Sequence, residues 1–264
     1  MAENQSLKIV VTGASSGIGR ALAYHLASLG HDVFLGARRK DALDDVCQKA
    51  KGLKGRLFSH HLDVSDEKSV KDFFVWLRSQ SSGLDVLINN AGIGLVESIE
   101  KSDLAHSKTL FDVNFFGPLL CSREAIPLLK QNSGQIIMIS SVNAFRGTPK
   151  KGVYSASKFA LRGLSDSMRV ELAPYGIKVI NINPGFVLTD FHIGDVEAKI
   201  TQENTVEQVV YAVVTSFKKK SPHVYVTLRG LIYSMLSEFF PQAMDKMMSK
   251  RHYKKFPIKG ASNC

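Results

Sequence analysis

Short apolar runs alternate along this chain with stretches in which apolar residues recur every three or four positions. The first run, 7–12, is rich in β-branched residues and carries no charge after Lys8. The stretch 17–29 that follows has apolar residues at helical spacing and is succeeded by Gly30, a residue typical of the position just after a helix. The pattern therefore predicts a strand followed directly by a helix.

The same two patterns recur to the end of the chain. They predict strands over 7–12, 32–37, 56–62, 84–88, 135–140, 177–182 and 223–227. They predict helices over 17–29, 41–50, 66–79, 154–173 and 205–217, and a helical stretch over 103–130 in which a bend is left open. The pair Thr205 and Gln208 has the spacing of a capping box at the start of one of these helices.

Nearly continuous apolar strands separated by helices indicate a parallel sheet that is covered on both faces. Right-handed crossovers then give a doubly wound α/β fold of the Rossmann type, with a mostly parallel seven-stranded sheet and helices on both faces. No repeat or linker interrupts the 264 residues, so we expect a single domain.

Net charge divides the chain into two parts. The whole chain carries +10, but residues 211–264 contain ten lysines and arginines against two acids, Glu238 and Asp245. The remaining 210 residues hold 24 basic and 22 acidic residues and are nearly neutral. A nearly neutral body argues against nucleic acid as a partner.

The three cysteines, Cys47, Cys121 and Cys264, are far apart, and no Cys or His cluster has the spacing of metal ligands. We expect no metal site, and reduced thiols in a cytosol-facing protein. The first residues lack the pattern of a secretory signal, and no run approaches the roughly 18 apolar residues of a membrane span. A cytoplasmic protein is the resulting expectation.

A glycine-rich segment, TGASSGIG at 12–19, lies between the first strand and the first helix. Glycines let the backbone turn tightly and approach a pyrophosphate, and the helix N-terminus supplies free N–H groups. The segment predicts dinucleotide binding by Gly13, Ser15, Ser16, Gly17, Ile18 and Gly19.

The end of the second strand indicates which dinucleotide is bound. NAD enzymes commonly have an acid there to hold the ribose 2′-hydroxyl, whereas this chain has Arg38, Arg39 and Lys40. A guanidinium accepts a 2′-phosphate through charge-assisted hydrogen bonds. Arg38 is the best candidate for such recognition and Arg39 the second, and both indicate NADP. We interpret Lys40 as an ordinary surface charge.

Tyr154 and Lys158 are four residues apart in a predicted helix and therefore lie on one face of it. An ammonium near a phenol lowers the phenol pKa, and this makes the phenol usable as an acid or base near neutral pH. Alone, the pair is more typical of an ordinary helix surface.

The ordered set of motifs resembles the short-chain dehydrogenase/reductase family over residues 7 to about 227. The matching segments follow successive predicted strands: TGASSGIG at 12–19, Asp63-Val64, NNAG at 89–92, Asn114, Ser140-Ser141, Tyr154-x-x-x-Lys158 and Pro184-Gly185. Ligands of doubly wound sheets bind at the carboxyl ends of strands, where these segments fall. The resemblance assigns 1–228 to the dinucleotide-binding and catalytic domain and leaves 229–264 as a basic amphipathic extension of it.

The resemblance implies four catalytic residues. Tyr154 would be the proton donor in reduction, and Lys158 would lower its pKa and hold the nicotinamide ribose. Ser141 would hydrogen-bond the substrate oxygen, with Ser140 as its buried strand neighbour. Asn114 would hold a water that relays protons to Lys158.

It also implies a set of cofactor contacts. Asp63 and Val64 would contact the adenine, and Asn90, Ala91 and Gly92 would line the cofactor cleft. A hydrogen bond that stabilises its loop is an equally good interpretation of Asn90. Contacts to the nicotinamide end would come from Pro184, Gly185, Val187 and Thr189.

These residues together predict an NADP(H)-dependent oxidoreductase that interconverts a carbonyl compound and an alcohol, acting as a reductase of a hydrophobic ketone or aldehyde. The alternatives are a peripheral membrane oxidoreductase with a lipid-like or steroid-like substrate, and an NADP-binding sensor without turnover. The family resemblance implies a homo-oligomer. Phe145, Phe186, Phe191 and His192 either line an apolar substrate pocket or pack in the ordinary way.

The C-terminal segment has an apolar stripe at helical spacing, and Pro241 interrupts it. The stripe consists of Ile232, Met235, Leu236, Phe239 and Phe240, and methionines 244, 247 and 248 continue it beside basic residues. Three interpretations remain open. The segment packs on the body or on a partner subunit, caps the substrate entrance, or attaches to an anionic membrane surface.

Overall fold

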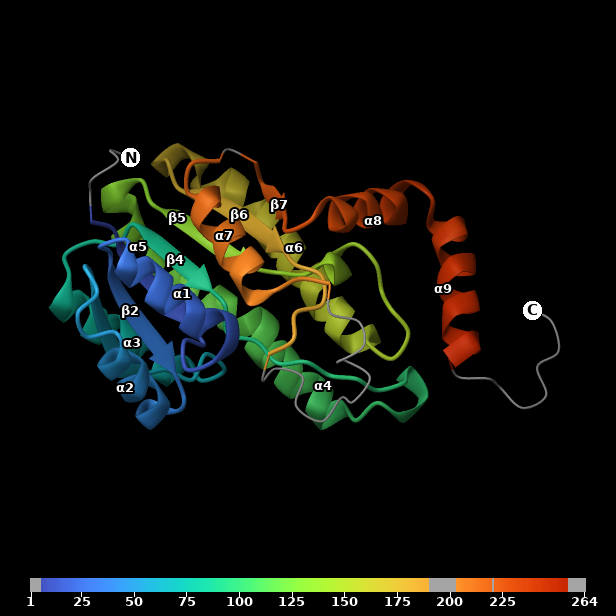
Figure 1. The fold of residues 1–264 in the computed structure, drawn as a ribbon, viewed down its shortest axis with the longest axis horizontal. Coiled ribbons are helices and arrows are strands. Elements are labelled where there is room, and N and C mark those ends of the chain that lie inside the picture. The colour runs from blue at the N-terminus through green and yellow to red at the C-terminus, as the bar shows by residue number, and fades with distance from the viewer. Residues whose placement is uncertain (1–5, 190–202, 220, 256–264) are drawn as a thin grey trace.

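A parallel sheet forms the centre of the protein (Figure 1). The computed structural model describes residues 6–189, 203–219 and 221–255. Within them, seven strands lie in the order β3-β2-β1-β4-β5-β6-β7, and every pairing is parallel. The strands are β1 (Lys8–Thr12), β2 (Asp32–Ala37), β3 (Arg56–His61), β4 (Val86–Asn89), β5 (Gln135–Ile139), β6 (Lys178–Asn183) and β7 (His223–Tyr225). The predicted doubly wound fold is confirmed.

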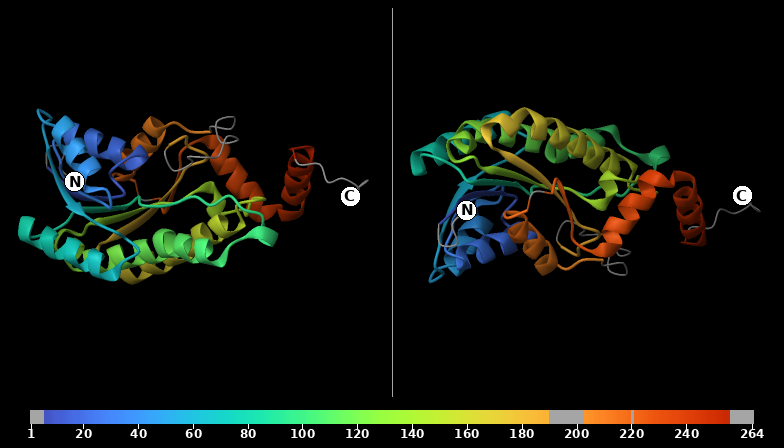
Figure 2. Two further views of the ribbon diagram at one scale, coloured as in Figure 1. Left: turned by 90° about the horizontal axis from the view of Figure 1, so that it is seen from below. Right: turned by 90° about the horizontal axis from the view of Figure 1, so that it is seen from above.

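Helices cover both faces of this sheet (Figure 2). They are α1 (Gly17–Ser28), α2 (Lys40–Lys49), α3 (Glu67–Gln80), α4 (Leu104–Phe111), α5 (Gly117–Asn132), α6 (Gly152–Leu172), α7 (Val206–Ser216), α8 (Leu228–Phe239) and α9 (Pro241–Lys255). Helices α1, α2 and α7 pack on one face, and α3, α5 and α6 pack on the other.

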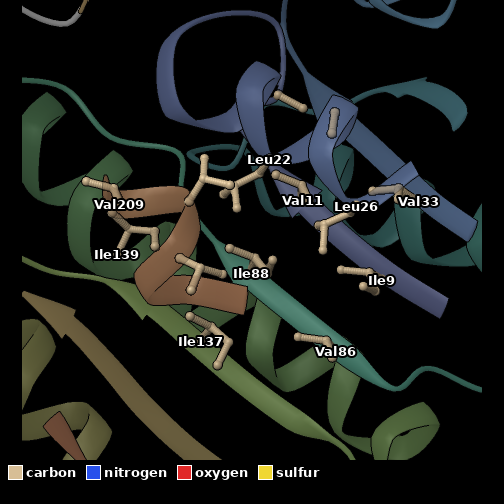
Figure 3. Packing of buried hydrophobic residues seen from close by; sticks show 14 of the residues in the cluster. Ile9, Val11, Leu22, Leu26, Val33, Val86, Ile88, Ile137, Ile139 and Val209 are labelled. Atoms are coloured by element: carbon tan, nitrogen blue, oxygen red, sulfur yellow. The ribbon is translucent and has the colours of Figure 1, made fainter. Parts of the chain in front are cut away.

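Alternate side chains of the central strands fill two separate cores. Ile9 and Val11 of β1 pack with Leu22 and Leu26 of α1 (Figure 3). Val10, between them, joins the core on the opposite face. Because both faces of the strand are buried, the strand has no polar side, and this explains the continuous apolar run in the sequence.

The strand order reverses at β1. After β3 the chain crosses to β4, which pairs with β1 on the side away from β2. The connection after β1 therefore leads to one side of the sheet, and the connection after β4 leads to the other. A crevice opens between them at the carboxyl ends of β1 and β4. Doubly wound sheets generally bind their ligands in such a crevice, which here lies next to the glycine-rich segment.

The predicted elements differ from the observed ones mainly in the helical stretch 103–130. It consists of α4 and α5, joined by a π-helical segment, Asp112–Phe116. Elsewhere α6 begins two residues before the predicted start, and β7 ends at Tyr225. The capping box is confirmed, because Gln208 N donates to the Thr205 hydroxyl and Thr205 N donates to the Gln208 side chain.

Helices α8 and α9 extend from one end of the body (Figures 1 and 2). The apolar stripe predicted on α8 exists, but Ile232, Met235, Leu236 and Phe239 are all exposed. Helix α8 packs on the body, but not through this stripe, and a partner subunit for the stripe stays open as an interpretation. None of the described helices is both long enough and apolar enough to cross a bilayer.

Candidate active site

The glycine-rich connection between β1 and α1 approaches the loop after β4 very closely. Gly13 has a φ of 66°, and a Cβ added to it would lie 2.8 Å from the Ala91 Cα. Ser16, the N-cap residue of α1, makes no side-chain capping bond. The first N–H groups of α1 are therefore left without a side-chain partner, as an anion-binding helix terminus requires.

Thr12 and Asn90 hold these two loops together. The Thr12 hydroxyl accepts from the backbone N–H groups of Asn90 and Ala91, each at 3.0 Å. The Asn90 amide donates to the Thr12 carbonyl at 2.9 Å and to the Gly13 carbonyl at 3.3 Å. Its amide is thus used to stabilise the loops, although the residue also borders the cleft.

Two arginines lie beside the glycine-rich loop at the end of β2. Both Arg38 and Arg39 are exposed and line the cleft. Arg39 Nη2 donates to the Ser15 hydroxyl at 3.1 Å, so this guanidinium is already held against the loop. Lys40 instead pairs with Asp44, with Nζ and Oδ2 3.1 Å apart, which agrees with its interpretation as a surface charge.

Asp63 follows β3 and borders the same cleft. One of its carboxylate oxygens accepts from the Ser65 N–H at 3.0 Å and from the Ser65 hydroxyl at 2.6 Å. Its own N–H donates to the Ser69 hydroxyl at 2.9 Å. These bonds fix the turn that presents Asp63 and Val64 to the cleft.

Asn114 lies in the π-helical segment and is fully buried. Its side chain accepts from the Ile93 N–H at 2.9 Å and donates to the Ile93 carbonyl at 3.0 Å and to the Ser157 hydroxyl at 3.3 Å. Ser157 in turn donates to the Tyr154 carbonyl at 2.7 Å. Asn114 therefore ties the loop after β4 to the start of α6.

Ser141, Tyr154 and Lys158 meet at the carboxyl end of β5. A hydrogen bond joins the side chains of Ser141 and Tyr154, and the Ser141 hydroxyl also accepts from the Asn143 N–H at 3.1 Å. Lys158 Nζ donates to the Ile139 carbonyl at 3.0 Å and lies 5.8 Å from the centre of the Tyr154 ring. The two hydroxyl groups are thus in contact, and the ammonium lies on the ring side of Tyr154, held by the Ile139 carbonyl.

Burial controls the protonation of this group. It raises the pKa of Tyr154 to about 12, against a smaller lowering by the Ser141 hydrogen bond, and it lowers the pKa of Lys158 to about 8. The sequence-based expectation of a lowered tyrosine pKa is not met, because desolvation outweighs the lowering by the Ser141 hydrogen bond. The phenol is consequently protonated at neutral pH.

One cleft of about 590 Å³ lies at the crevice between β1 and β4. Every predicted site residue lines it except Gly19 and Asn114. Gly19 packs against the Gly13 carbonyl, and Asn114 lies behind Ile93. The sequence analysis missed seven lining residues: Ala37, Leu62, Ile93, Gly94, Val113, Ile139 and Ser140. Most of them are next to a predicted site residue at the end of a strand. They could have been predicted from that position.

Two of the residues considered for a substrate pocket, Phe145 and Phe186, are described, and both lie outside the cleft. Phe145 is buried under the Arg162 guanidinium, 4.2 Å from its ring centre, and packs edge-on against His223. It does not line the cleft, and neither does Phe186. Phe191 and His192 lie outside the described residues. Among the described residues, no three metal-binding side chains gather at one place.

Comparison with known proteins identifies the family. Residues 8–200 match the short chain dehydrogenase family. An uncharacterised oxidoreductase of Staphylococcus saprophyticus is 34% identical over 80% of this chain and 93% of its own. An 11-beta-hydroxysteroid dehydrogenase of Arabidopsis thaliana is 36% identical over 70% of this chain and 54% of its own. A crystal structure of a short chain dehydrogenase from Burkholderia cenocepacia in complex with NADP is 27% identical, covers 93% of this chain and 98% of its own, and has a TM-score of 0.82.

Proposed function

Because the chain belongs to the short-chain dehydrogenase family, we propose that it is an NADP(H)-dependent oxidoreductase that reduces a hydrophobic ketone or aldehyde to an alcohol. One observation carries the proposal. The glycine-rich loop, the two arginines after β2 and the group of Ser141, Tyr154 and Lys158 border a single cleft. Such a cleft can hold a dinucleotide along its length and a carbonyl group at one end.

The chain's residues fit the dinucleotide at both ends. The uncapped start of α1 suits a pyrophosphate, and the missing Cβ of Gly13 leaves space for the loops to meet. Exposed Arg38, and Arg39 held by Ser15, suit a 2′-phosphate. Lys158 would hold the ribose next to the nicotinamide. When bound, the cofactor supplies the hydride.

The chain's own contribution is the proton and the electrostatic environment. Tyr154, protonated up to high pH, donates its proton to the substrate oxygen as negative charge develops there. Ser141 offers a second hydroxyl to the same oxygen, and the Asn143 N–H fixes its position. A neutral phenol suits reduction, because the oxidative direction needs a phenolate. Asn114 holds α6 in register through Ser157 and Ile93.

The hydrophobic substrate class has support from a relative, because an 11-beta-hydroxysteroid dehydrogenase is 36% identical over 70% of this chain. We propose a lipid-like or steroid-like carbonyl compound within that class. We also propose a homo-oligomer in the cytoplasm, with no nucleic acid as partner. A sensor without turnover is disfavoured, because Ser141, Tyr154 and Lys158 are all present and line one cleft.

Replacing Arg38 with alanine tests the cofactor. A charge-assisted hydrogen bond contributes about 1.5–3 kcal/mol. NADPH affinity should therefore fall by about 10- to 100-fold, whereas NADH affinity should stay within about twofold because NADH lacks the phosphate. Fluorescence titration of both dinucleotides measures this difference.

Lys40→Ala is the matched control for this experiment, since Lys40 adjoins the arginines in sequence but pairs with Asp44. It should leave both affinities unchanged. Equal losses of NADPH and NADH affinity in the Arg38 variant would show that Arg38 does not read the 2′-phosphate.

A further inference from the structure

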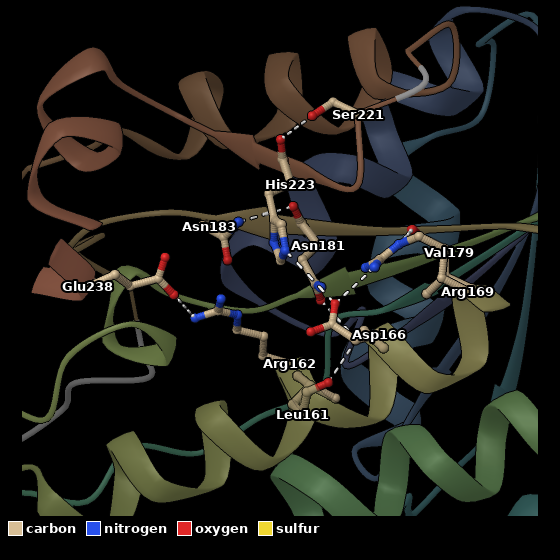
Figure 4. A network of polar contacts seen from close by, with 11 residues as sticks. Leu161, Arg162, Asp166, Arg169, Val179, Asn181, Asn183, Ser221, His223 and Glu238 are labelled. Carbon is tan, nitrogen blue, oxygen red and sulfur yellow. Dashed lines mark hydrogen bonds and ion pairs between the residues drawn. The ribbon is translucent and has the colours of Figure 1, made fainter. Parts of the chain in front are cut away.

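Helix α8 attaches to the body through two buried serines, with Leu231 and Tyr233 partly buried beside them. Ser234 is fully buried and Ser237 is 4% exposed, both on the inner face. On the same face a Cβ added to Gly230 would lie 3.3 Å from Val142. An ion pair between Glu238 of α8 and Arg162 of α6, 2.5 Å apart, adds to this attachment (Figure 4).

The outer face of α8 is apolar. Leu228 is 70% exposed, Phe239 71% and Phe240, just after the helix, 59%. Ile232, Met235 and Leu236 lie between them and are also exposed. This arrangement is the reverse of an ordinary packed helix, which turns its apolar stripe inward. A contiguous exposed apolar face of this kind marks an interaction surface.

The two acids of this region are both neutralised by the body. Glu238 pairs with Arg162, and Asp245 of α9 pairs with Arg146, which also donates to the Pro241 carbonyl. These are the two acids of residues 211–264. The other charged side chains described on the two helices are cationic and exposed: Arg229, Lys246, Lys250 and Arg251.

We propose that α8 and α9 dock on an anionic lipid bilayer. Their docking surface, here called the C-terminal foot, consists of Leu228, Ile232, Met235, Leu236, Phe239 and Phe240 with Lys246, Lys250 and Arg251. The aromatic and aliphatic side chains enter the boundary between headgroups and acyl chains, and the cations face acidic headgroups. The surface therefore has both signals that reversible membrane attachment needs.

Charge complementarity favours a bilayer over a second copy of this chain. A twofold interface would bring the same surface of two copies together. Residues 211–264 carry ten basic residues against two acids, and both acids already have partners within the chain. Foot-to-foot contact would place cations against cations, whereas acidic lipid supplies the missing negative charge.

The inner face of α8, opposite the foot, packs next to the end of the cleft where the carbonyl group is expected. Gly230 of α8 packs against Val142, the residue next to Ser141. A carbonyl compound dissolved in the bilayer would therefore enter near Ser141 and Tyr154. This consequence rests on the proposed function, whereas membrane docking itself does not.

Vesicle flotation of the full chain tests docking without any measurement of activity. The wild-type protein should float with phosphatidylcholine vesicles that contain phosphatidylserine, and at least about tenfold less with pure phosphatidylcholine. Binding should fall when salt rises from about 0.1 M to about 1 M, because ions screen the attraction.

Two pairs of variants separate the foot from the rest of the surface. Phe239→Ser should lose most of the binding, whereas Tyr211→Ser on α7, which replaces an aromatic residue of the same 71% exposure, should keep it. Lys246→Glu with Lys250→Glu should abolish binding. The control makes an equal change of charge on the exposed turn after α2, by combining Lys51→Glu with Lys54→Glu. This control should reduce vesicle binding only slightly.

Three results would overturn the proposal. The first is a wild-type protein that does not float with acidic vesicles. The second is equal binding by the foot variants and their controls, with thermal unfolding unchanged in all of them. The third is a wild-type dimer that Phe239→Ser converts to a monomer in size-exclusion chromatography with light scattering while flotation stays the same. That result would assign the foot to a second copy.

Discussion

Replacing Tyr154 with phenylalanine should lower kcat for carbonyl reduction by about 10³-fold or more, near the upper range for loss of a positioned general acid. Burial keeps the pKa of Tyr154 at about 12, so the wild-type phenol carries its proton throughout the neutral range. Phenylalanine fills the same space but cannot donate. NADPH binding should stay within about twofold, because the change removes a contact made mainly in the transition state. Single-turnover kinetics and a separate NADPH titration measure the two effects.

Tyr225→Phe is the control for this change. Tyr225 lies on β7, and burial raises its pKa too, but it does not line the cleft. This variant should keep at least about half of the wild-type kcat. If Tyr154→Phe retained more than a tenth of the activity, Tyr154 could not be the proton donor.

Replacing Lys158 with methionine should remove activity and yet stabilise the fold. Activity should fall by about 10²-fold or more, because the ammonium near Tyr154 is lost. Burial lowers the pKa of Lys158 from 10.5 to about 8, so at pH 7 the folded state bears the cost of a buried charge. That cost is on the order of 3 kcal/mol. The hydrogen bond to the Ile139 carbonyl recovers about 1 kcal/mol of it.

The melting temperature of the methionine variant should therefore exceed that of the wild type by about 5 °C at pH 7. Between pH 8 and pH 10.5 the unfolded wild-type chain holds a proton that the folded chain has released. Wild-type stability thus rises with pH across this window relative to the variant, and the difference should shrink. Melting curves at about pH 7 and about pH 10 measure it.

Lys178→Met, which replaces an exposed lysine of β6, is the matched control and should change neither activity nor stability appreciably. A methionine variant of Lys158 that melts below the wild type at pH 7 would show that the ammonium stabilises the fold. The loss of activity in the Lys158 variant would then come partly from a less stable fold.

The sheet could be predicted from sequence because its strands are buried on both faces. Val10 and Ile9 point to opposite cores, so no polar position interrupts the run. The π-helical segment could not be predicted, because Asn114 and its neighbours keep the apolar spacing of an ordinary helix. Its cause is tertiary, since the Asn114 side chain binds both backbone groups of Ile93.

Much of the site could be predicted because its residues follow strands in a fixed order. The pKa of Tyr154 could not be predicted, since it depends on desolvation in the folded structure and on the hydrogen bond with Ser141. Helical spacing likewise predicted the stripe on α8 but not its direction. The direction follows from Ser234 and Ser237, which lie on the opposite face and pack inward.

The most direct test is the consumption of NADPH and of NADH by the wild-type protein with a panel of hydrophobic ketones and aldehydes. We expect at least one compound to be reduced to its alcohol, mole for mole, with a kcat/KM at least about tenfold higher for NADPH than for NADH. Reduction of no compound with either dinucleotide, or a preference for NADH, would contradict the proposed function.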